Sequence, residues 1–408
     1  MQTILPATLR AGLCGVILGA AAGAESYEAY YLFTGEFPHN EGTIYSDNFQ
    51  GLTHDANNWF FSTNLTDNNH PTLFRVPVEY DLRHVRDDLP EQYPGVIRRS
   101  LHANLPHLVT LGYHHFGDIS YYNGWVIVAT ESNATLDAML LFRASDLQYI
   151  GRLLVPNDPP RPSWLNCMNS GNPPEARSLG WVAVDPDGFL YTSGDCVSSI
   201  YRYSIDWNNV PNQWTGTEYL EVLTYEETNQ LWDEAGYPLV VGHTQGGVFS
   251  ESGDLFYLLV GQIHDHDPNE GINVFNTEIW QRVRQSDNQS DPADPFDYNF
   301  DPGSPYGEEP EGITIWDLDD GRAPNIRGQL HVGKADWEID GYDIYLDHYT
   351  NVIDTNPVTT LGWANGFAWD GARIRLQAGN YPETLVITKR VELSGSGGDV
   401  VIGAGVGP

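Results

Sequence analysis

The chain has 408 residues, of which 41% are hydrophobic and 12% aromatic, a composition that indicates a folded protein and argues against disorder. Acidic residues outnumber basic ones by 55 to 20, and the formal net charge is −35 at pH 7. A surface this negative repels phosphate groups, which argues against nucleic acid and anionic membrane as partners. The 41 Gly and 26 Pro residues favour a fold with many turns.

Residues 1–24 have the layout of a secretory signal peptide. Arg10 precedes an apolar stretch at 11–22, and small residues at 22–24 offer a cleavage site. The stretch is too short to span a bilayer, and no later run reaches about 18 apolar residues. We therefore expect a secreted protein, extracellular or periplasmic, that is monomeric and has no membrane span.

Strand-forming runs rich in Val, Ile, Tyr, Trp and Phe dominate the following residues, broken by turn signals. Four segments share one layout: a glycine opens a strand, a polar turn follows, and a bulky apolar residue starts the return strand. The return residues fall at 59, 125, 189 and 255, so the period is 64 to 66 residues. A repeated hairpin at a constant period is typical of repeat architectures. The four segments are 51–59, 117–125, 180–189 and 246–255.

Each repeat also contains a later strand in which two large apolar residues precede an arginine, at 73–75, 141–143 and 200–202. Two hairpins in one repeat make a four-stranded blade, and we predict a β-propeller over 25–355. A β-sandwich with similar hairpins explains the constant spacing less well. A further repeat is expected near residue 320, and five or six blades are both compatible with the sequence. The best candidate for a short helix is the Glu-rich stretch at 225–234.

The turn Asp-Pro-Asp-Gly-Phe-Leu-Tyr at 185–191 resembles turns of secreted propellers in the NHL, SMP-30 and strictosidine-synthase-like group. This resemblance covers single turns. Segments 115–119, 311–321 and 328–332 together look like a class of secreted bacterial proteins of unassigned function. Both resemblances imply the propeller fold and carry no activity.

The C-terminal residues differ in character, because 374–398 alternates apolar and polar residues over short strands. This segment closely resembles the opening coil of a pectate-lyase-like right-handed β-helix. A solenoid needs about three or more repeats to bury its core. We therefore expect 356–408 to be the start of a β-helix-like segment, truncated after about two rungs; the alternative is that these strands pack elsewhere. The resemblance implies a parent protein that attaches to or acts on extracellular polysaccharide.

Two cysteines follow the leader, Cys167 and Cys196. In an exported chain an even pair predicts a disulfide, which here closes a loop of about 30 residues and contributes about 3 kcal/mol. Neither cysteine has a second Cys or His at the spacing of a metal site.

Candidate catalytic residues gather near the repeated glycines, which we expect to open the innermost strands. They are His54, His115, Asp118 and His243. Imidazole and carboxylate groups together bind divalent metals or transfer protons near neutral pH. The alternative for each histidine is a structural role, hydrogen-bonded to a backbone carbonyl near the propeller axis.

The loop at 264–271 is a second constellation, in which Asp265, Asp267 and Asn269 alternate as in a calcium loop. The glycine stands one place late for an EF-hand, and no glutamate occupies the twelfth position. Calcium is the predicted ion. The alternatives are a transition metal, which the two histidines of this loop would suit, and a solvated polar loop.

Two functions remain open from the sequence. The first is an extracellular binding or scaffold module for polysaccharide or a protein partner. The second is a metal-dependent hydrolase or lactonase-like enzyme with a His/Asp site at the propeller centre. Aromatic residues at the hairpins would stack on sugars in the first, although packing between blades is the more general use of such residues. These aromatic residues are Trp59, Trp125, Trp181 and Trp363.

Overall fold

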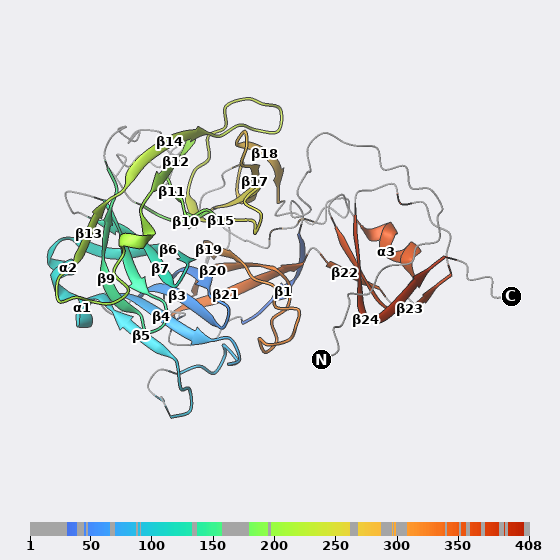
Figure 1. Cartoon of the computed structure of the whole chain (residues 1–408), viewed down its shortest axis with the longest axis horizontal. Coiled ribbons are helices and arrows are strands. Elements are labelled where there is room, and N and C mark those ends of the chain that lie inside the picture. Colours follow the sequence, from blue (N-terminus) through green and yellow to red (C-terminus); the bar gives the residue numbers. More distant parts are fainter. Residues whose placement is uncertain are drawn as a thin grey trace. The chain divides into compact units, whose positions relative to one another are not determined.

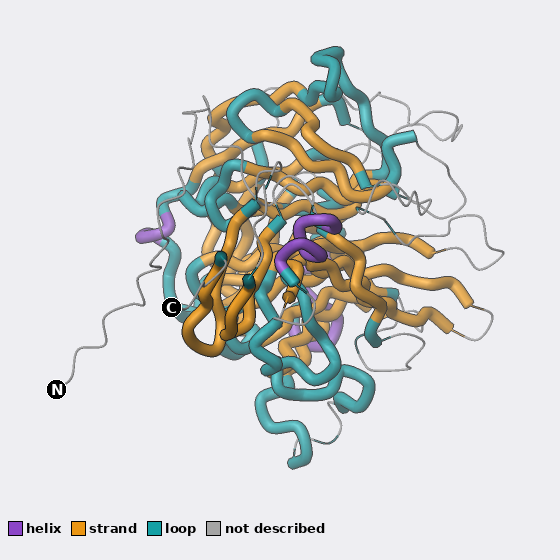
Figure 2. The backbone as a smooth tube through the Cα atoms, turned by 90° about the vertical axis from the view of Figure 1, so that its right-hand side faces the viewer, coloured by secondary structure: helices purple, strands orange, loops and turns teal. Residues whose placement is uncertain are grey.

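The structure, a computed structural model, divides into two compact units, Leu32–Tyr349 and a second unit that contains Thr350–Pro408 together with Met1–Tyr31. Strands make up most of its regular structure, as Figure 2 shows, and its helices are short. The structure describes residues 31–403 except 39–44, 46–47, 66–69, 87–88, 90, 133–136, 157–178, 195–196, 262–267, 287–295, 297, 299–307, 339–340, 351, 356–359, 369–371, 383–386 and 388–390.

The unit Leu32–Tyr349 is a five-bladed β-propeller, which confirms the predicted fold (Figure 1). Each blade is a separate sheet, and the inner strands β2, β6, β10, β15 and β19 begin the blades in chain order. Blade 1 contains β2 (Phe49–His54), β3 (Asn58–Leu65), β4 (His70–Pro77) and β5 (Ile97–Ser100). Blade 2 contains β6 (Tyr113–Tyr122), β7 (Trp125–Ser132), β8 (Ala138–Arg143), β9 (Gln148–Leu154) and β13 (Tyr219–Val222).

Blades 3 to 5 repeat this arrangement, and the motif of two apolar residues and an arginine falls on the third strands β4, β8 and β12. Blade 3 contains β10 (Ala183–Val184), β11 (Leu190–Thr192), β12 (Ser199–Ser204) and β14 (Thr224–Gln230). Blade 4 contains β15 (Thr244–Phe249), β16 (Leu255–Val260), β17 (Gly271–Asn276) and β18 (Gln281–Gln285). Blade 5 contains β19 (Glu308–Ile315), β20 (Leu330–Glu338), β21 (Gly341–Thr350) and β1 (Leu32–Glu36).

The ring is closed by β1, the first strand of the unit, which pairs with β21 at the outer edge of blade 5. In Figure 1 the blue β1 therefore lies beside the orange strands of the last blade. Glu36 of β1 forms an ion pair with the buried Lys334 at 2.9 Å, and Lys334 also contacts Glu308 and Asp347 at 3.3 and 3.2 Å. His348 contacts the carbonyl oxygen of Phe37 through Nε2 at 2.7 Å.

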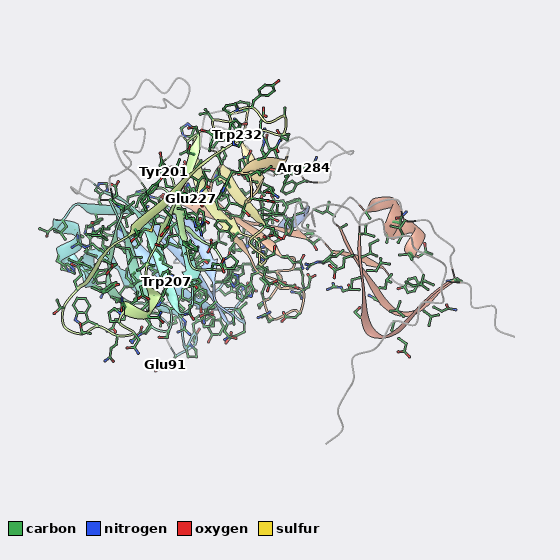
Figure 3. All side chains as sticks on the ribbon, turned by 45° about the horizontal axis from the view of Figure 1, so that its top comes forward. Glu91, Tyr201, Trp207, Glu227, Trp232 and Arg284 are labelled. Atoms are coloured by element: carbon green, nitrogen blue, oxygen red, sulfur yellow. The ribbon has the colours of Figure 1, made fainter. Side chains whose placement is uncertain are left out.

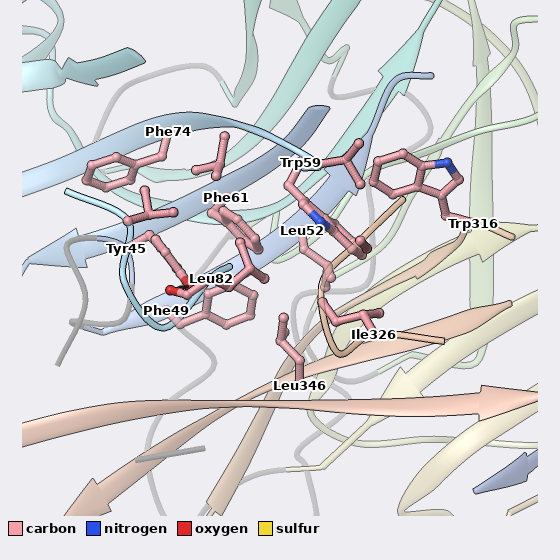
Figure 4. Close-up of a cluster of buried hydrophobic side chains, with 14 of the residues drawn as sticks. Tyr45, Phe49, Leu52, Trp59, Phe61, Phe74, Leu82, Trp316, Ile326 and Leu346 are labelled. Atoms are coloured by element: carbon pink, nitrogen blue, oxygen red, sulfur yellow. Dashed lines mark hydrogen bonds between the residues drawn. The ribbon is translucent and has the colours of Figure 1, made fainter. Parts of the chain in front are cut away.

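The hydrophobic core lies between neighbouring blades. One cluster joins blades 1 and 5, where Trp59 meets Trp316 edge to face and Tyr45 stacks on Phe61 (Figure 4). Similar clusters join blades 1 and 2, 2 and 3, and 3 and 4. The expected packing role of the hairpin tryptophans is confirmed for Trp59, Trp125 and Trp181, which are buried, and the side chain of Trp363 lies outside the described residues.

Two expectations are corrected by the sheets. The alternative of a sixth blade is wrong, because β19, which contains Gly312, is the inner strand of the fifth blade and β1 then closes the ring. The helix expected at 225–234 is the outer strand β14, which pairs with β12. The ion pair of Glu227 with Arg202 at 2.8 Å crosses these two strands, and Figure 3 shows Glu227 beside Tyr201 on this blade.

The described helices are peripheral to the blades. They are α1 (Leu101–Asn104), α2 (Pro106–Thr110) and the 3-10 turn η1 (Trp207–Asn209) in the propeller, and α3 (Leu361–Phe367) in the second unit. None of the helices in the described part of the chain is long and apolar enough to cross a membrane.

The C-terminal part of the second unit contains a parallel sheet in the order β22-β23-β24. Its strands stack with Ile374 opposite Leu393, and Ile374, Leu376 and Tyr381 are buried. Parallel stacking is compatible with β-helix rungs, and the β-helix interpretation stays a prediction. The strands are β22 (Val352–Thr355), β23 (Arg373–Tyr381) and β24 (Glu392–Ile402).

Candidate functional site

The five inner strands run in the same direction around the propeller axis. Residues that precede the repeated glycines contact one another across blades; for example, Gln50 contacts Glu311. Residues that follow the glycines also contact one another; for example, the His54 ring contacts the carbonyl oxygen of Ile315. We call the end of the axis at which the inner strands begin the entry face, and define it by Gln50, His115, Gln245, Glu309 and Glu311.

Glycine is required where the inner strands meet at the axis. A Cβ on Gly312 would lie 2.8 Å from the Cα of Gly51, and a Cβ on Gly117 would lie 2.1 Å from the carbonyl oxygen of Gly180. Such distances leave no room for any side chain, so the repeated glycines of the sequence are a consequence of close backbone approach. They bring the five blades together beneath the entry face.

Asp118 occupies the centre of this glycine ring and is fully buried. Its carboxylate accepts hydrogen bonds from the backbone N–H of Ile119 at 2.8 Å and of Gly247 at 3.3 Å. The N–H groups of Leu52 and Ile313 also donate to it. Burial raises the pKa of Asp118, and the four backbone donors oppose this effect. The carboxylate therefore connects the inner strands of blades 1, 2, 4 and 5.

His54 lies at the opposite end of the axis from the entry face. It stacks on Trp316 with ring centroids 4.3 Å apart, and its Nε2 contacts the carbonyl oxygen of Ile315 at 2.7 Å. Its Nδ1 contacts the carbonyl oxygen of Asp55 at 3.0 Å, and burial lowers the pKa of the ring. Both nitrogens thus serve backbone contacts, as in the structural alternative.

His115 lies at the entry face on β6. Its Nε2 is 2.6 Å from Oε1 of Gln50, whose Nε2 donates to Oε1 of Glu311 at 3.0 Å. Gln50 and Glu311 are both 6% exposed. The pKa of His115 is lowered to about 4, chiefly by burial and secondarily by the neighbouring His114. Three blades therefore contribute to one polar chain, Glu311 to Gln50 to His115.

A second polar pair adds to the entry face. Gln245 of β15 donates from Nε2 to Oε1 of Glu309 at 2.9 Å, which joins blade 4 to blade 5. Gln245 and Glu309 are partly exposed. Amide, imidazole and carboxylate groups from blades 1, 2, 4 and 5 thus surround the same end of the axis.

The four predicted catalytic residues do not form one cluster. His115 precedes its glycine by two residues and His54 follows its own by three, so roughly 16 Å of strand separates their levels along the axis. His243 is buried and directly precedes β15 of blade 4. The described residues contain no group of three or more His, Cys, Asp or Glu side chains placed to hold a metal ion.

The predicted calcium loop and disulfide are described only in part. Asp265, Asp267, Cys167 and Cys196 lie outside the described residues. The amide of Asn269 accepts from Arg282 at 2.9 Å and donates to the carbonyl oxygen of Val240 at 3.1 Å. Its side chain thus stabilises blade 4, and calcium remains a prediction.

Gln50, Glu309 and Glu311 of the entry face are not among the residues predicted from the sequence, whereas Gln245 stands near the same glycine as the predicted His243. The signal was present in the sequence, because three of the five axial glycines directly follow Gln50, Gln245 and Glu311. A side chain one residue before an axial glycine is held close to the axis by the glycine itself.

Comparison with known proteins gives only distant similarities in fold. No family model matches the chain, and no curated protein matches it. A protein of unknown function from Bacteroides thetaiotaomicron is similar with a TM-score of 0.36 and 10% identity, covering 76% of this chain and 72% of that one. A GH43_1 enzyme from Xanthomonas citri complexed with xylotriose is similar with a TM-score of 0.40 and 10% identity, covering 76% and 89%.

Proposed function

We propose that the protein is a secreted β-propeller that binds extracellular polysaccharide at its entry face. The observation that carries this proposal is the polar chain of Glu311, Gln50 and His115, which three different blades bring together at the axis. Fixed amide, carboxylate and imidazole groups of this kind match the hydroxyl groups of a sugar, which both donate and accept hydrogen bonds.

The arrangement of the axis supports a binding role. Beneath the entry face the glycine ring and Asp118 fill the axis, so a ligand at this end does not pass through the propeller. The polar groups are held by one another and by the backbone, as Gln50 also donates to the carbonyl oxygen of Phe49 at 2.8 Å. Groups fixed before binding lose little conformational entropy when a ligand arrives.

The metal-dependent hydrolase is less well supported. That mechanism needs His54, His115, Asp118 and His243 around one cation, and His54 and His115 belong to opposite ends of the inner strands. The carboxylate of Asp118 is fully buried beneath the axial glycines. A binding module therefore agrees better with the positions of these residues.

The proposal is tested by titrating the purified full chain with polysaccharides and oligosaccharides in a calorimeter. Gln50→Ala and His115→Ala are expected to weaken binding at least tenfold. His84→Ala, at an exposed histidine after β4, is the matched control and should bind as the unmodified protein does. Equal affinity of all four proteins, with each variant folded by circular dichroism, would contradict binding at the entry face.

A further inference from the structure

We infer that His331 and His348 form an acid-sensitive latch on β1, the strand that closes the propeller, and that acidification loosens this strand while the other outer strands stay paired. The two histidines lie directly opposite each other on β20 and β21, and both are buried. Neither belongs to the entry face, so this inference is independent of the proposed function.

Three contacts join the two rings to each other and to the backbone. Nδ1 of His331 lies 2.7 Å from Nδ1 of His348. Nε2 of His331 lies 2.8 Å from the carbonyl oxygen of Trp316, and Nε2 of His348 lies 2.7 Å from the carbonyl oxygen of Phe37. Phe37 directly follows β1, and its N–H donates to the carbonyl oxygen of Leu346 at 2.8 Å. The ring of His348 therefore fastens the end of the closing strand to blade 5.

These contacts limit the number of protons that the closed pair can hold. A carbonyl oxygen only accepts, so each Nε2 contact needs one hydrogen, and the contact between the two Nδ1 atoms has room for one. The closed pair holds at most three, because a fourth would place two N–H groups against each other at 2.7 Å. We define the open state as the one in which β1 has detached and water reaches both rings. Two imidazolium rings then carry four hydrogens, so acid favours the open state.

Burial acts in the same direction. It lowers the pKa of both rings, and the charge of His348 lowers the pKa of His331 further. A histidine whose pKa is lowered in the closed state stabilises that state above its ordinary pKa, and the stabilisation is lost as the pH falls. The ordinary pKa of histidine is about 6.5, so we expect β1 to loosen progressively below about pH 6.5.

Two ionisable groups outside the pair act on it among the described residues. Glu36 of β1 raises the pKa of His348, as does the carbonyl group of Phe37, but burial outweighs both effects. His54 of β2 lies near His331, and its positive charge would lower the pKa of that ring further. Neither group reverses the expected response to acid.

The neighbouring ion pairs do not produce the same response. Asp347 directly precedes His348, and burial raises its pKa, so its protonation in acid would favour the closed state. Burial lowers the pKa of Lys334, the carboxylates of Asp347, Glu308 and Glu36 raise it, and the net shift is upward. Lys334 therefore keeps its charge as the pH falls. Loosening of β1 just below neutral pH is thus expected from the histidine pair.

The test follows amide hydrogen exchange of the full chain between pH 7 and pH 5, with each rate corrected for the intrinsic pH dependence of exchange. Protection of β1 and of the Phe37 N–H is expected to fall by at least about tenfold relative to β18, the outer strand of blade 4, because the open state takes up more protons. Unchanged protection of β1 relative to β18 overturns the inference.

Variants identify the group responsible. His348→Gln keeps an amide donor for the Phe37 carbonyl and does not titrate, so the relative protection of β1 should become constant over this range. His331→Gln tests the same point from the other ring, and circular dichroism checks that each variant is folded. Glu36→Gln is the matched control on β1 and should keep the acid response. A response that survives both histidine substitutions, or that Glu36→Gln abolishes, overturns the inference.

Discussion

Replacing Asp118 by alanine is expected to destabilise the propeller strongly. The substitution removes the acceptor for backbone N–H groups of Leu52, Ile119, Gly247 and Ile313, which belong to four of the five inner strands. These donors are buried around the axis and lose their partner together. The cavity left by the side chain is small, so loss of hydrogen bonding accounts for most of the effect.

The magnitude follows from the donors that would be left unsatisfied. Each buried N–H group that loses its acceptor costs about 1–3 kcal/mol, so four of them would cost about 4–12 kcal/mol. Removing a buried carboxylate also relieves its desolvation penalty of several kcal/mol. We therefore expect a net loss of about 3–5 kcal/mol in the free energy of unfolding for Asp118→Ala. Asp118→Asn keeps the shape and one acceptor oxygen and should lose less.

The assay is equilibrium unfolding in urea, followed by tryptophan fluorescence. Asp187→Ala, in the exposed turn between β10 and β11, is the matched control and should change the free energy by less than about 0.5 kcal/mol. A loss below about 1 kcal/mol for Asp118→Ala would show that the carboxylate does not hold the inner strands together.

Four further outcomes are expected. His54→Ala should lower stability by about 2 kcal/mol through lost stacking and hydrogen bonding, and should leave saccharide affinity unchanged, as calorimetry can check. Lys334→Ala should cost about 3–5 kcal/mol in urea unfolding, because it leaves the buried carboxylate of Asp347 without its cation. Saccharide affinity should be constant from pH 8 to about 5 and fall as the pH drops through about 4, where His115 takes up a proton and its ring can no longer accept a hydrogen bond. A decline centred near pH 6.5 in a pH series would contradict this. The melting temperature should rise with salt and fall on chelation, because cations screen a net charge of −35; a value indifferent to both would count against the predicted calcium and saline setting.

The fold was predictable because the positions that admit the fewest residue types, those at the axis, are occupied by glycine, which is easily recognised in the sequence. The axial glycines recur at a constant period, and the structure shows why, since a Cβ on Gly51 would lie 2.5 Å from the Cα of Asp118. The turn between β6 and β7 is equally predictable, because a type I′ hairpin turn requires positive φ at both central residues and Asn-Gly is the pair that favours it. Asn123 and Gly124 both have positive φ. Such local conformational requirements can be predicted from the sequence.

Blade closure and the outer strand of blade 3 were not predictable in the same way. The pairing of β1 with β21 joins residues about 310 apart in the chain, and no local pattern indicates it. The stretch 225–234 is rich in glutamate, which favours a helix in isolation, yet pairing with β12 determines its conformation. Tertiary contacts decide both features.

The candidate site was predictable only in part. His115 and Asp118 are neighbours of the same glycine, but Asp118 lies within the glycine ring and His115 at the entry face. The sequence gives the distance of each residue from its glycine, and this offset alone separates His54 from His115. It does not give the partner across the blades, and the contacts that join Gln50 to Glu311 and to His115 are seen only in the structure.

The most direct test of the proposed binding site is a pair of calorimetric titrations of the full chain with the oligosaccharide that binds best. The unmodified protein should bind one oligosaccharide per chain. Gln50→Ala, which removes the link between Glu311 and His115, should weaken that binding at least tenfold while remaining folded. Unchanged affinity of a folded Gln50→Ala variant would contradict binding at the entry face.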